Sequence, residues 1–231
     1  MTSALGLYMR LNLPEPWHAT TVPIPLIVYG ASEAVGAFAI KLAQASNIHP
    51  IIAVAGKGEA YVEKLISREK GDTIIDYRKG NEAVVLCFKE ALKKAGISEV
   101  KYAFDAVSEK NSYQNICEVL AKDGKITLIL PGKDYAEIPE TVEKSLTEVG
   151  SSHFGVRANS IEGKAGIKMG SKEFAYVFFR LFSKALQDGW LTPHPYEVVP
   201  GGLNGVGEGL SNLMNGKASA VKYVYRIADT K

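Results

Sequence analysis

Short continuous apolar runs alternate with longer amphipathic stretches along the first part of the chain. The runs predict strands at 25–29, 50–55, 73–76, 102–107 and 125–130. Between them, apolar residues spaced by three and four positions predict helices over 33–45, 59–68, 82–95 and 112–120. The strand runs are continuous rather than alternating between apolar and polar residues, so both faces of the sheet are expected to be covered. The pattern therefore predicts an α/β fold with a doubly wound parallel sheet.

The rhythm changes after about residue 133. The pattern there predicts a strand within 142–150, a loop over 161–171, a helix over 173–187, a strand at 196–199, a helix at 204–214 and a final strand at 220–227. The helix over 173–187 carries Phe174, Phe178 and Phe182, and Trp190 follows it. These side chains either pack inside the same domain or form an apolar surface for a partner domain.

Composition and charge narrow the class of protein. The 231 residues are 46% apolar and 23% charged, which is typical of an ordered globular chain. A net charge of +2 gives no bias toward nucleic acid or a membrane surface. Two cysteines cannot build a disulfide framework or a four-ligand zinc site by themselves. Because the sequence has no membrane-length apolar run and no basic leader, we expect a cytoplasmic protein. We also expect that it holds no metal and that its substrate is a small molecule.

The residues from Gly30 to Gly36 form the turn from the first predicted strand into the first predicted helix. Such a turn binds the pyrophosphate of a dinucleotide, because small residues admit the phosphates and the helix N-terminus attracts their charge. Ser32 is able to cap the helix or to donate its hydroxyl to phosphate. Gly36 is expected to allow close packing of helix on strand. The candidate pyrophosphate residues are Gly30, Ala31, Ser32, Glu33, Ala34, Val35 and Gly36.

The turn departs from the strict G-x-G-x-x-G pattern, because Ala31 and Glu33 occupy the first two glycine places. An ordinary strand-to-helix turn is therefore the alternative, although the repeated β-α context favours a nucleotide site. A carboxylate beside a pyrophosphate is repulsive, so the Glu33 side chain is expected to point to solvent. In that position it interacts favourably with the helix dipole.

The end of the second strand indicates which dinucleotide is bound. NAD sites usually carry an acidic residue there, but this strand ends in Ala55-Gly56-Lys57. Nothing at that position repels a 2′-phosphate, and Lys57 is able to attract one. Tyr77 and Arg78, after the third strand, lie at the same edge. The pattern favours NADP over NAD, the alternative for Lys57 and Arg78 being solvated surface charge.

Motifs of several other enzyme classes are absent from the sequence. No tyrosine is followed four residues later by lysine, as short-chain dehydrogenases require. The chain also lacks a phosphate-binding P-loop, an H-E-x-x-H metal motif and a G-x-S-x-G nucleophile elbow.

Four stretches resemble the medium-chain dehydrogenase/reductase superfamily, and more narrowly its zinc-independent enoyl reductases of the fungal trans-enoyl reductase type and its quinone-reductase-like members. They are residues 28–43, Asp76-Tyr77-Arg78, Phe104-Asp105-Ala106-Val107-Ser108 and 216–227. Members of this family begin with a GroES-like catalytic domain, whose N-terminal portion has no counterpart here. The resemblance thus implies the C-terminal, cofactor-binding portion of a longer enzyme, with a tail that belongs to the catalytic domain.

The resemblance implies a division into a linker helix and lead-in over 1–24, an NADP-binding Rossmann domain over 25–160, and C-terminal helices and strands over 161–231 that complete the fold. It places Gly56, Lys57 and Tyr77 near the adenosine 2′-phosphate. It places Val107, Ser108, Leu130 and Pro131 beside the nicotinamide.

The implied activity is hydride transfer from NADPH to an activated double bond or carbonyl of an enoyl, enone or quinone substrate. The resemblance also implies a homodimer through the edge of the sheet. An isolated cofactor domain supplies only half of the cleft, so weak or no turnover is expected. Two alternatives remain open: a non-catalytic dinucleotide-binding module or partner subunit, and a doubly wound protein that binds another ligand such as an adenosyl group. An acidic residue ending the second strand would favour the latter, and Gly56 stands there instead.

Overall fold

The computed structural model describes residues 1–154 and 171–231. Its main sheet has the order β3-β2-β1-β4-β5-β6, with every neighbouring pair parallel. The strands are β1 (Leu26–Tyr29), β2 (Ile51–Ala55), β3 (Thr73–Asp76), β4 (Val100–Asp105), β5 (Leu120–Leu128) and β6 (Glu143–Leu146). The helices between them are α2 (Ala34–Ala45), α3 (Glu59–Val62), α4 (Asn81–Lys94) and α5 (Ser112–Cys117). This strand order confirms the doubly wound fold.

Side chains of β1 alternate between two separate cores. Leu26 and Val28 pack into a cluster with helix α2, whereas Ile27 and Tyr29 pack into a cluster with α4 and α5. All four are buried. Successive strand residues point to opposite faces, so a strand that is buried throughout must be covered on both sides. Burial on both faces of the sheet explains why the sequence of this strand is apolar at every position.

The first residues form a helix that packs against α2. Helix α1 (Thr2–Ala4) continues into a π-helical segment (Leu5–Arg10), and a 3₁₀ turn follows at Pro16–His18. The Ser3 hydroxyl donates to the Val35 carbonyl (2.8 Å), and the Tyr8 hydroxyl donates to the Leu42 carbonyl (3.0 Å). The lead-in is therefore part of the main body.

Several predicted elements are longer than the observed ones, among them the helix over 112–120, which ends at Cys117. The helix expected over 59–68 ends at Val62, and a 3₁₀ turn follows at Arg68–Lys70. The buried Asp72 carboxylate accepts from the Ser67 amide (2.8 Å) and from the Ile51 amide (2.7 Å). This competition removes the Ser67 donor from a continuing helix. The strand expected over 142–150 is β6, which ends at Leu146.

The remaining elements are α6 (Ser151–Phe154), α8 (Ser171–Gln187), β7 (Tyr196–Val198), a 3₁₀ turn (Gly202–Gly205), α9 (Val206–Met214), β8 (Lys222–Val224) and a 3₁₀ turn (Ile227–Asp229). Helix α8 packs on the body through Phe178, with Phe174 and Phe182 partly buried beside it. We call residues 1–154 and 171–191 the body. The boundary expected at residue 160, and all of the loop expected over 161–171 except Ser171, lie outside the described residues.

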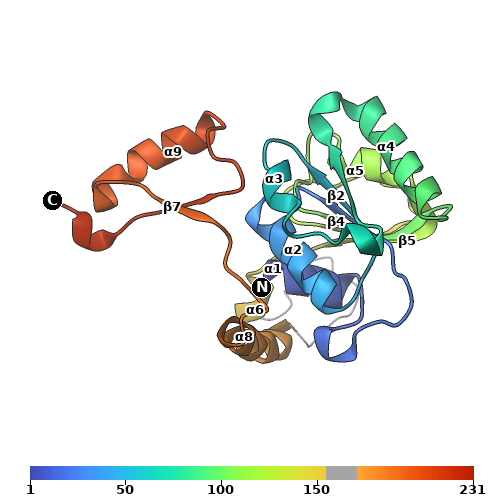
Figure 1. Ribbon diagram of the computed structural model, residues 1–231, viewed down its shortest axis with the longest axis horizontal. Coiled ribbons are helices and arrows are strands. Elements are labelled where there is room, and N and C mark those ends of the chain that lie inside the picture. Colours follow the sequence, from blue (N-terminus) through green and yellow to red (C-terminus); the bar gives the residue numbers. More distant parts are fainter. Residues whose placement is uncertain (155–170) are drawn as a thin grey trace.

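We call residues 192–231 the C-terminal arm. Its strands β7 and β8 pair with each other in parallel and do not join the main sheet. In Figure 1, α9 and the two strands stand to one side of the body. The strand expected over 220–227 is limited to Lys222–Val224, because Ala220 adopts a left-handed backbone conformation (φ 52°). Among the described helices, none combines the length and the apolar character needed to cross a membrane.

Candidate functional site

The turn after β1 is a closed backbone structure. Gly30 has a positive φ of 77°, which favours glycine. The amides of Gly30 and Ala31 donate to the Val54 carbonyl of β2 (3.1 and 2.9 Å), and the Glu33 amide donates to the Gly30 carbonyl (3.0 Å). These bonds hold the chain in one conformation as it enters α2.

Gly36 allows α2 to approach this turn closely. A Cβ atom at Gly36 would lie 2.2 Å from the Gly30 carbonyl oxygen, a backbone atom that cannot move aside cheaply. Any larger residue would push the helix away from the turn. This is the close packing that the sequence predicts for Gly36.

The N-terminus of α2 presents free backbone donors. The first intrahelical bond runs from the Ala37 amide to the Glu33 carbonyl (2.8 Å), so the amides of Ala34, Val35 and Gly36 have no intrahelical acceptor. Glu33 is the N-cap residue, and its side chain makes no capping hydrogen bond. Three uncapped amides at the positive end of a helix form an environment that suits a phosphate group.

Ser32 does not cap the helix, which corrects one of the two expectations for it. Its side chain packs against the loop after β2: a Cβ atom at Gly58 would lie 2.4 Å from the Ser32 Cβ atom. Within the described part of the chain, the Ser32 hydroxyl has no hydrogen-bond partner. It therefore remains available to an anion at the turn.

The Glu33 side chain is exposed, as expected. Its pKa is raised above the ordinary value, first because the surrounding protein removes part of its hydration, and next because the Asp105 carboxylate repels a second negative charge.

The edge formed by the ends of β2 and β3 brings together the residues predicted for the adenosine end. Gly56 follows β2, and a Cβ atom there would lie 2.5 Å from the Tyr77 ring, so the ring packs directly on the glycine. Lys57 is exposed, and the described residues include no ion-pair partner for it. Lys57 and the Tyr77 ring are thus near neighbours at this edge.

Arg78 has a partner of its own. Its guanidinium binds the Asp76 carboxylate with Nη2 2.7 Å from Oδ2, and its backbone amide donates to the same carboxylate (2.9 Å). The Arg78 hydrogen bonds lower the pKa of Asp76 to about 2. The geometry therefore leaves Lys57 without an ion pair among the described residues, whereas Arg78 is paired with Asp76.

The end of β4 lies beside the turn after β1. Strand β1 is paired with β2 on one side and β4 on the other, with Tyr29 opposite Asp105. The Val107 side chain packs against the turn, because a Cβ atom at Gly30 would lie 2.8 Å from its Cγ2 atom. The strand order reverses between β1 and β4, because β2 and β3 lie on one side of β1 and β4, β5 and β6 on the other. Ligands of such sheets bind at this switch point.

The four residues predicted beside the nicotinamide differ in accessibility. Leu130 is half-buried and Pro131 is exposed at the end of β5. Val107 is half-buried, whereas Ser108 is completely buried. Ser108 therefore has no surface with which to touch a ligand, and its place in the site is behind Val107.

The C-terminal arm reaches the same edge, which the sequence pattern did not predict. A Cβ atom at Gly58 would lie 3.2 Å from the Ala220 Cβ atom. At the base of the arm, the His194 ring meets the Tyr61 ring edge-on at 5.2 Å, and the Lys41 ammonium donates to the Thr192 carbonyl (2.8 Å). Residues so distant along the chain leave no local signal of such a contact.

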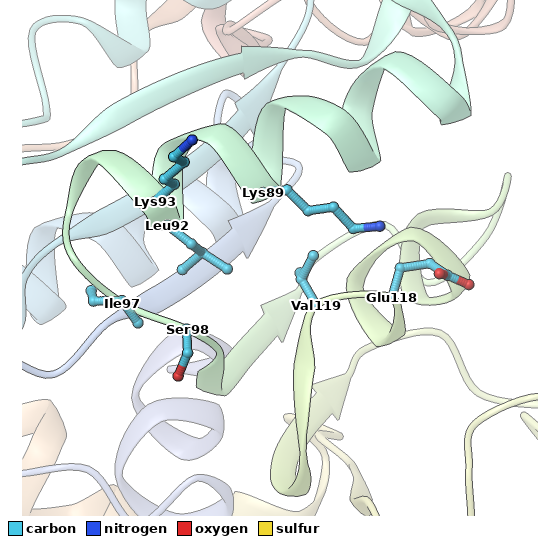
Figure 2. A pocket seen from close by; sticks show the side chains of 7 residues that line it. All are labelled: Lys89, Leu92, Lys93, Ile97, Ser98, Glu118 and Val119. Atoms are coloured by element: carbon cyan, nitrogen blue, oxygen red, sulfur yellow. The ribbon is translucent and has the colours of Figure 1, made fainter.

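A cavity of about 400 Å³ lies near the amino-terminal ends of β4 and β5, at the opposite end of the strands from the turn after β1. Figure 2 shows its side chains, which come from α4 and from the segments just before β4 and β5: Lys89, Leu92, Lys93, Ile97, Ser98, Glu118 and Val119. It is separate from the turn after β1. The described residues contain no group of three or more His, Cys, Asp or Glu side chains that could hold a metal ion.

No protein-family model matches the chain. The chain is 47% identical to trans-enoyl reductase fsr4 of Gibberella fujikuroi over 207 residues, which are 88% of this chain and 56% of that protein. Its fold resembles the CurF enoyl reductase cyclopropanase of curacin A biosynthesis (TM-score 0.66, 17% identity), covering 96% of this chain and 59% of that one.

It also resembles a Bacillus thuringiensis protein assigned as an NADPH:quinone reductase (TM-score 0.63, 16% identity), covering 92% of this chain and 57% of that one. The chain thus spans little more than half the length of these proteins. At such identities the solved structures establish the fold alone. The sequence similarity to a fungal trans-enoyl reductase and the shared fold agree with the resemblance to the medium-chain dehydrogenase/reductase superfamily, fungal trans-enoyl reductase type.

Proposed function

We propose that the chain forms the NADP-binding part of a reductase that transfers hydride from NADPH to an activated double bond or carbonyl of an enoyl, enone or quinone substrate. The observation that carries this proposal is the uncapped N-terminus of α2 at the switch point between β1 and β4. Relatives named trans-enoyl reductases support the enoyl class of substrate.

Different residues at the carboxyl ends of the strands would bind different parts of a dinucleotide. The amides of Ala34 and Val35, together with the Ser32 hydroxyl, would bind the pyrophosphate. Val107 and Leu130 would border the nicotinamide. When bound, the nicotinamide supplies the hydride, and the task of the protein is to hold the ring in a fixed position and to exclude water.

We propose NADP rather than NAD because of the adenosine edge. The residues directly after β2 are Gly56 and Lys57, and neither is acidic. Asp76, at the end of β3, is neutralised by Arg78. Lys57 is thus able to pair with a 2′-phosphate, and the Tyr77 ring lies beside it.

We propose that the substrate side of the cleft comes from a catalytic domain that the matched region of the relatives does not include. The C-terminal arm supports this proposal, because several of its large apolar side chains are exposed. A second domain that covers the arm would bury them. The chain by itself is then expected to bind the coenzyme and to turn over weakly or not at all.

We also propose a homodimer through the outer edge of β6. Among the described residues this strand has a neighbour on one side only, so its other edge carries unpaired backbone groups. The Thr147 amide, just after β6, donates to the Leu128 carbonyl at the end of β5, so the alternating amide of Lys144 faces the open edge. Light scattering of the chain, and of a variant with Lys144→Pro in β6, tests the proposal. A proline there removes an outward-facing backbone donor, and a monomeric wild-type chain would contradict the proposal.

Titration with NADPH and NADH, followed by the fluorescence of the reduced nicotinamide, tests the proposed cofactor site. We expect saturable binding with a preference of about tenfold or more for NADPH, since the preference reflects one charge-assisted contact. Equal affinity for the two coenzymes would contradict the assignment to NADP, and no binding would contradict the whole proposal. An enone-reduction assay on the same sample tests the expected weak turnover.

A further inference from the structure

Asp105 is a completely buried carboxyl at the end of β4, and the chain that follows wraps around it. Its Oδ1 atom accepts from the amides of Val107 (2.9 Å) and Ser108 (2.8 Å). Its Oδ2 atom accepts from the Ser112 hydroxyl (2.6 Å). The bonds connect the strand end, the loop and the first residue of α5. They define the backbone direction of the loop where it passes the switch point.

Ser108 connects this loop to the next strand. Its hydroxyl donates to the Asp105 carbonyl (3.0 Å) and accepts from the Ile129 amide just beyond β5 (2.9 Å). The residue adopts a left-handed conformation with φ 59°, which is unfavourable for serine, and the hydrogen bonds of its buried hydroxyl hold it there. Lys133 donates to the Ser108 carbonyl from the same side (3.3 Å).

Between these two residues lies Val107, whose side chain packs against Gly30. Its amide is held by Asp105, and the residue after it is bonded to two strands. Neither the Asp105 carboxylate nor the Ser108 hydroxyl has exposed surface, so neither can touch a ligand in the crevice. Any effect that they have on a ligand must pass through the position of Val107.

We infer that Asp105 and Ser108 are positioning residues that fix Val107 as the wall against which the nicotinamide ring of the coenzyme rests. The inference rests on the proposed function, and it assigns to this network the nicotinamide end of the site alone. The adenosine and pyrophosphate ends are held by β2, β3 and α2, which make none of these bonds. Disruption of the network should therefore weaken the hold on the nicotinamide and leave the rest of the coenzyme bound as before.

The test compares NADPH with 2′-phospho-ADP-ribose, which lacks the nicotinamide, in the Ser108→Gly variant of the full chain. Glycine accepts the positive φ, so this variant removes the hydroxyl without straining the loop. We expect NADPH affinity to fall about fivefold to tenfold, as for the loss of two net hydrogen bonds. The affinity for 2′-phospho-ADP-ribose should stay within about twofold. The fluorescence of bound NADPH should also become weaker, because the ring is less restrained.

Asn111→Gly is the matched control. Asn111 lies in the same loop with φ 65°, is exposed, and makes no side-chain hydrogen bond among those described. The control thus adds a glycine at a left-handed position without touching the network. It should leave the affinities for both ligands unchanged. If it lowers NADPH affinity as much as Ser108→Gly does, loop flexibility explains the effect and the inference is wrong.

Asp105→Asn and Asp105→Ala provide an independent pair. Asparagine keeps an oxygen that accepts from the two amides, so Asp105→Asn should preserve NADPH affinity. Alanine removes the acceptor, so Asp105→Ala should lower NADPH affinity. An equal loss of both ligands in Ser108→Gly, or no loss of either, overturns the inference while the proposed function stands. Failure of the wild-type chain to bind NADPH overturns both.

Discussion

The body and the C-terminal arm contain the same kinds of elements but differ in what covers them. In the body, every residue of β1 and β2 is buried, and Phe88 and Phe104 are completely enclosed. In the arm, Met214 is 88% exposed and Ile227 is 71% exposed. Among the described strands, β7 and β8 have only each other as neighbours. The body has helices on both faces of its sheet, whereas the arm has one helix beside its two strands.

This difference indicates that regular secondary structure does not imply an independently stable unit. A two-stranded sheet with one helix buries little apolar area, and burial is the main favourable contribution to stability. The arm is held to the body at its base, where Lys41 binds Thr192 and the His194 ring meets Tyr61. The stability of the chain should therefore come almost entirely from the body.

The largest expected effect separates the two regions by stability. Phe88→Ala removes a completely buried ring between α4 and the sheet and should lower the free energy of unfolding by about 3–5 kcal/mol. Leu213→Ala in α9, a half-exposed position, should change it by less than about 0.5 kcal/mol. Urea unfolding followed by circular dichroism measures both. Similar costs at the two sites would show that the arm is part of the same cooperative core.

A matched pair of glycines sharpens the comparison. Gly36→Ala places a Cβ atom against the Gly30 carbonyl, and overpacking of this kind costs about 1–3 kcal/mol. Displacement of α2 should also lower NADPH affinity at least about tenfold. A Cβ atom at Gly207 in α9 meets nothing within 4 Å. Gly207→Ala should leave binding unchanged and raise helix stability slightly, so reduced NADPH affinity in this variant would contradict the prediction.

Two cations of the body differ in availability. Lys57→Ala should lower NADPH affinity about tenfold and leave NADH affinity unchanged, because the proposed partner of Lys57 is the 2′-phosphate, which NADH lacks. Arg78→Ala should have a smaller effect, since Asp76 already holds the guanidinium. Titration of each variant with both coenzymes decides the order. A larger loss for Arg78→Ala would mean that Arg78 leaves Asp76 for the coenzyme.

The smallest expected effect concerns the acidic residues at the N-terminal ends of two helices, Glu33 at α2 and Glu208 in α9. Glu33→Gln should tighten NADPH binding about threefold at pH 7, the size of one solvent-screened charge repulsion. Because the pKa of Glu33 is raised, its carboxyl becomes protonated as the pH falls, so the advantage of the variant should shrink at lower pH. Glu208→Gln in α9 should have no effect at any pH. An advantage that grows as the pH falls would contradict the assignment to Glu33.

Much of the fold could be predicted because its signals are local. The apolar run at 26–29 and the helical spacing of 34–45 are properties of adjacent residues, and the structure places β1 and α2 there. The resemblance of residues 28–43 to one superfamily located the turn at the carboxyl edge. Gly36 could be assigned to close packing because the motif places a glycine at that point for a geometric reason.

The errors arose where residues distant in sequence compete for local groups. Helix α3 ends early because Asp72 accepts the Ser67 amide while it also binds Ile51 in another strand. The Asp76–Arg78 pair shows a different limit, since adjacent charges in the sequence do not reveal whether they bind each other or a ligand. Ser108 was expected beside the nicotinamide, but its complete burial places it behind Val107.

The pattern of residues by itself determined the strand-helix alternation, the doubly wound sheet and the position of the turn after β1, because these depend on the burial preference and backbone conformation of neighbouring residues. Only the tertiary structure decided which groups face the crevice. That outcome depends on hydrogen bonds and packing between segments far apart in the chain, such as Ser108 with Ile129 and Gly58 with Ala220. No local preference encodes such contacts, because they form only when the sheet brings those segments together.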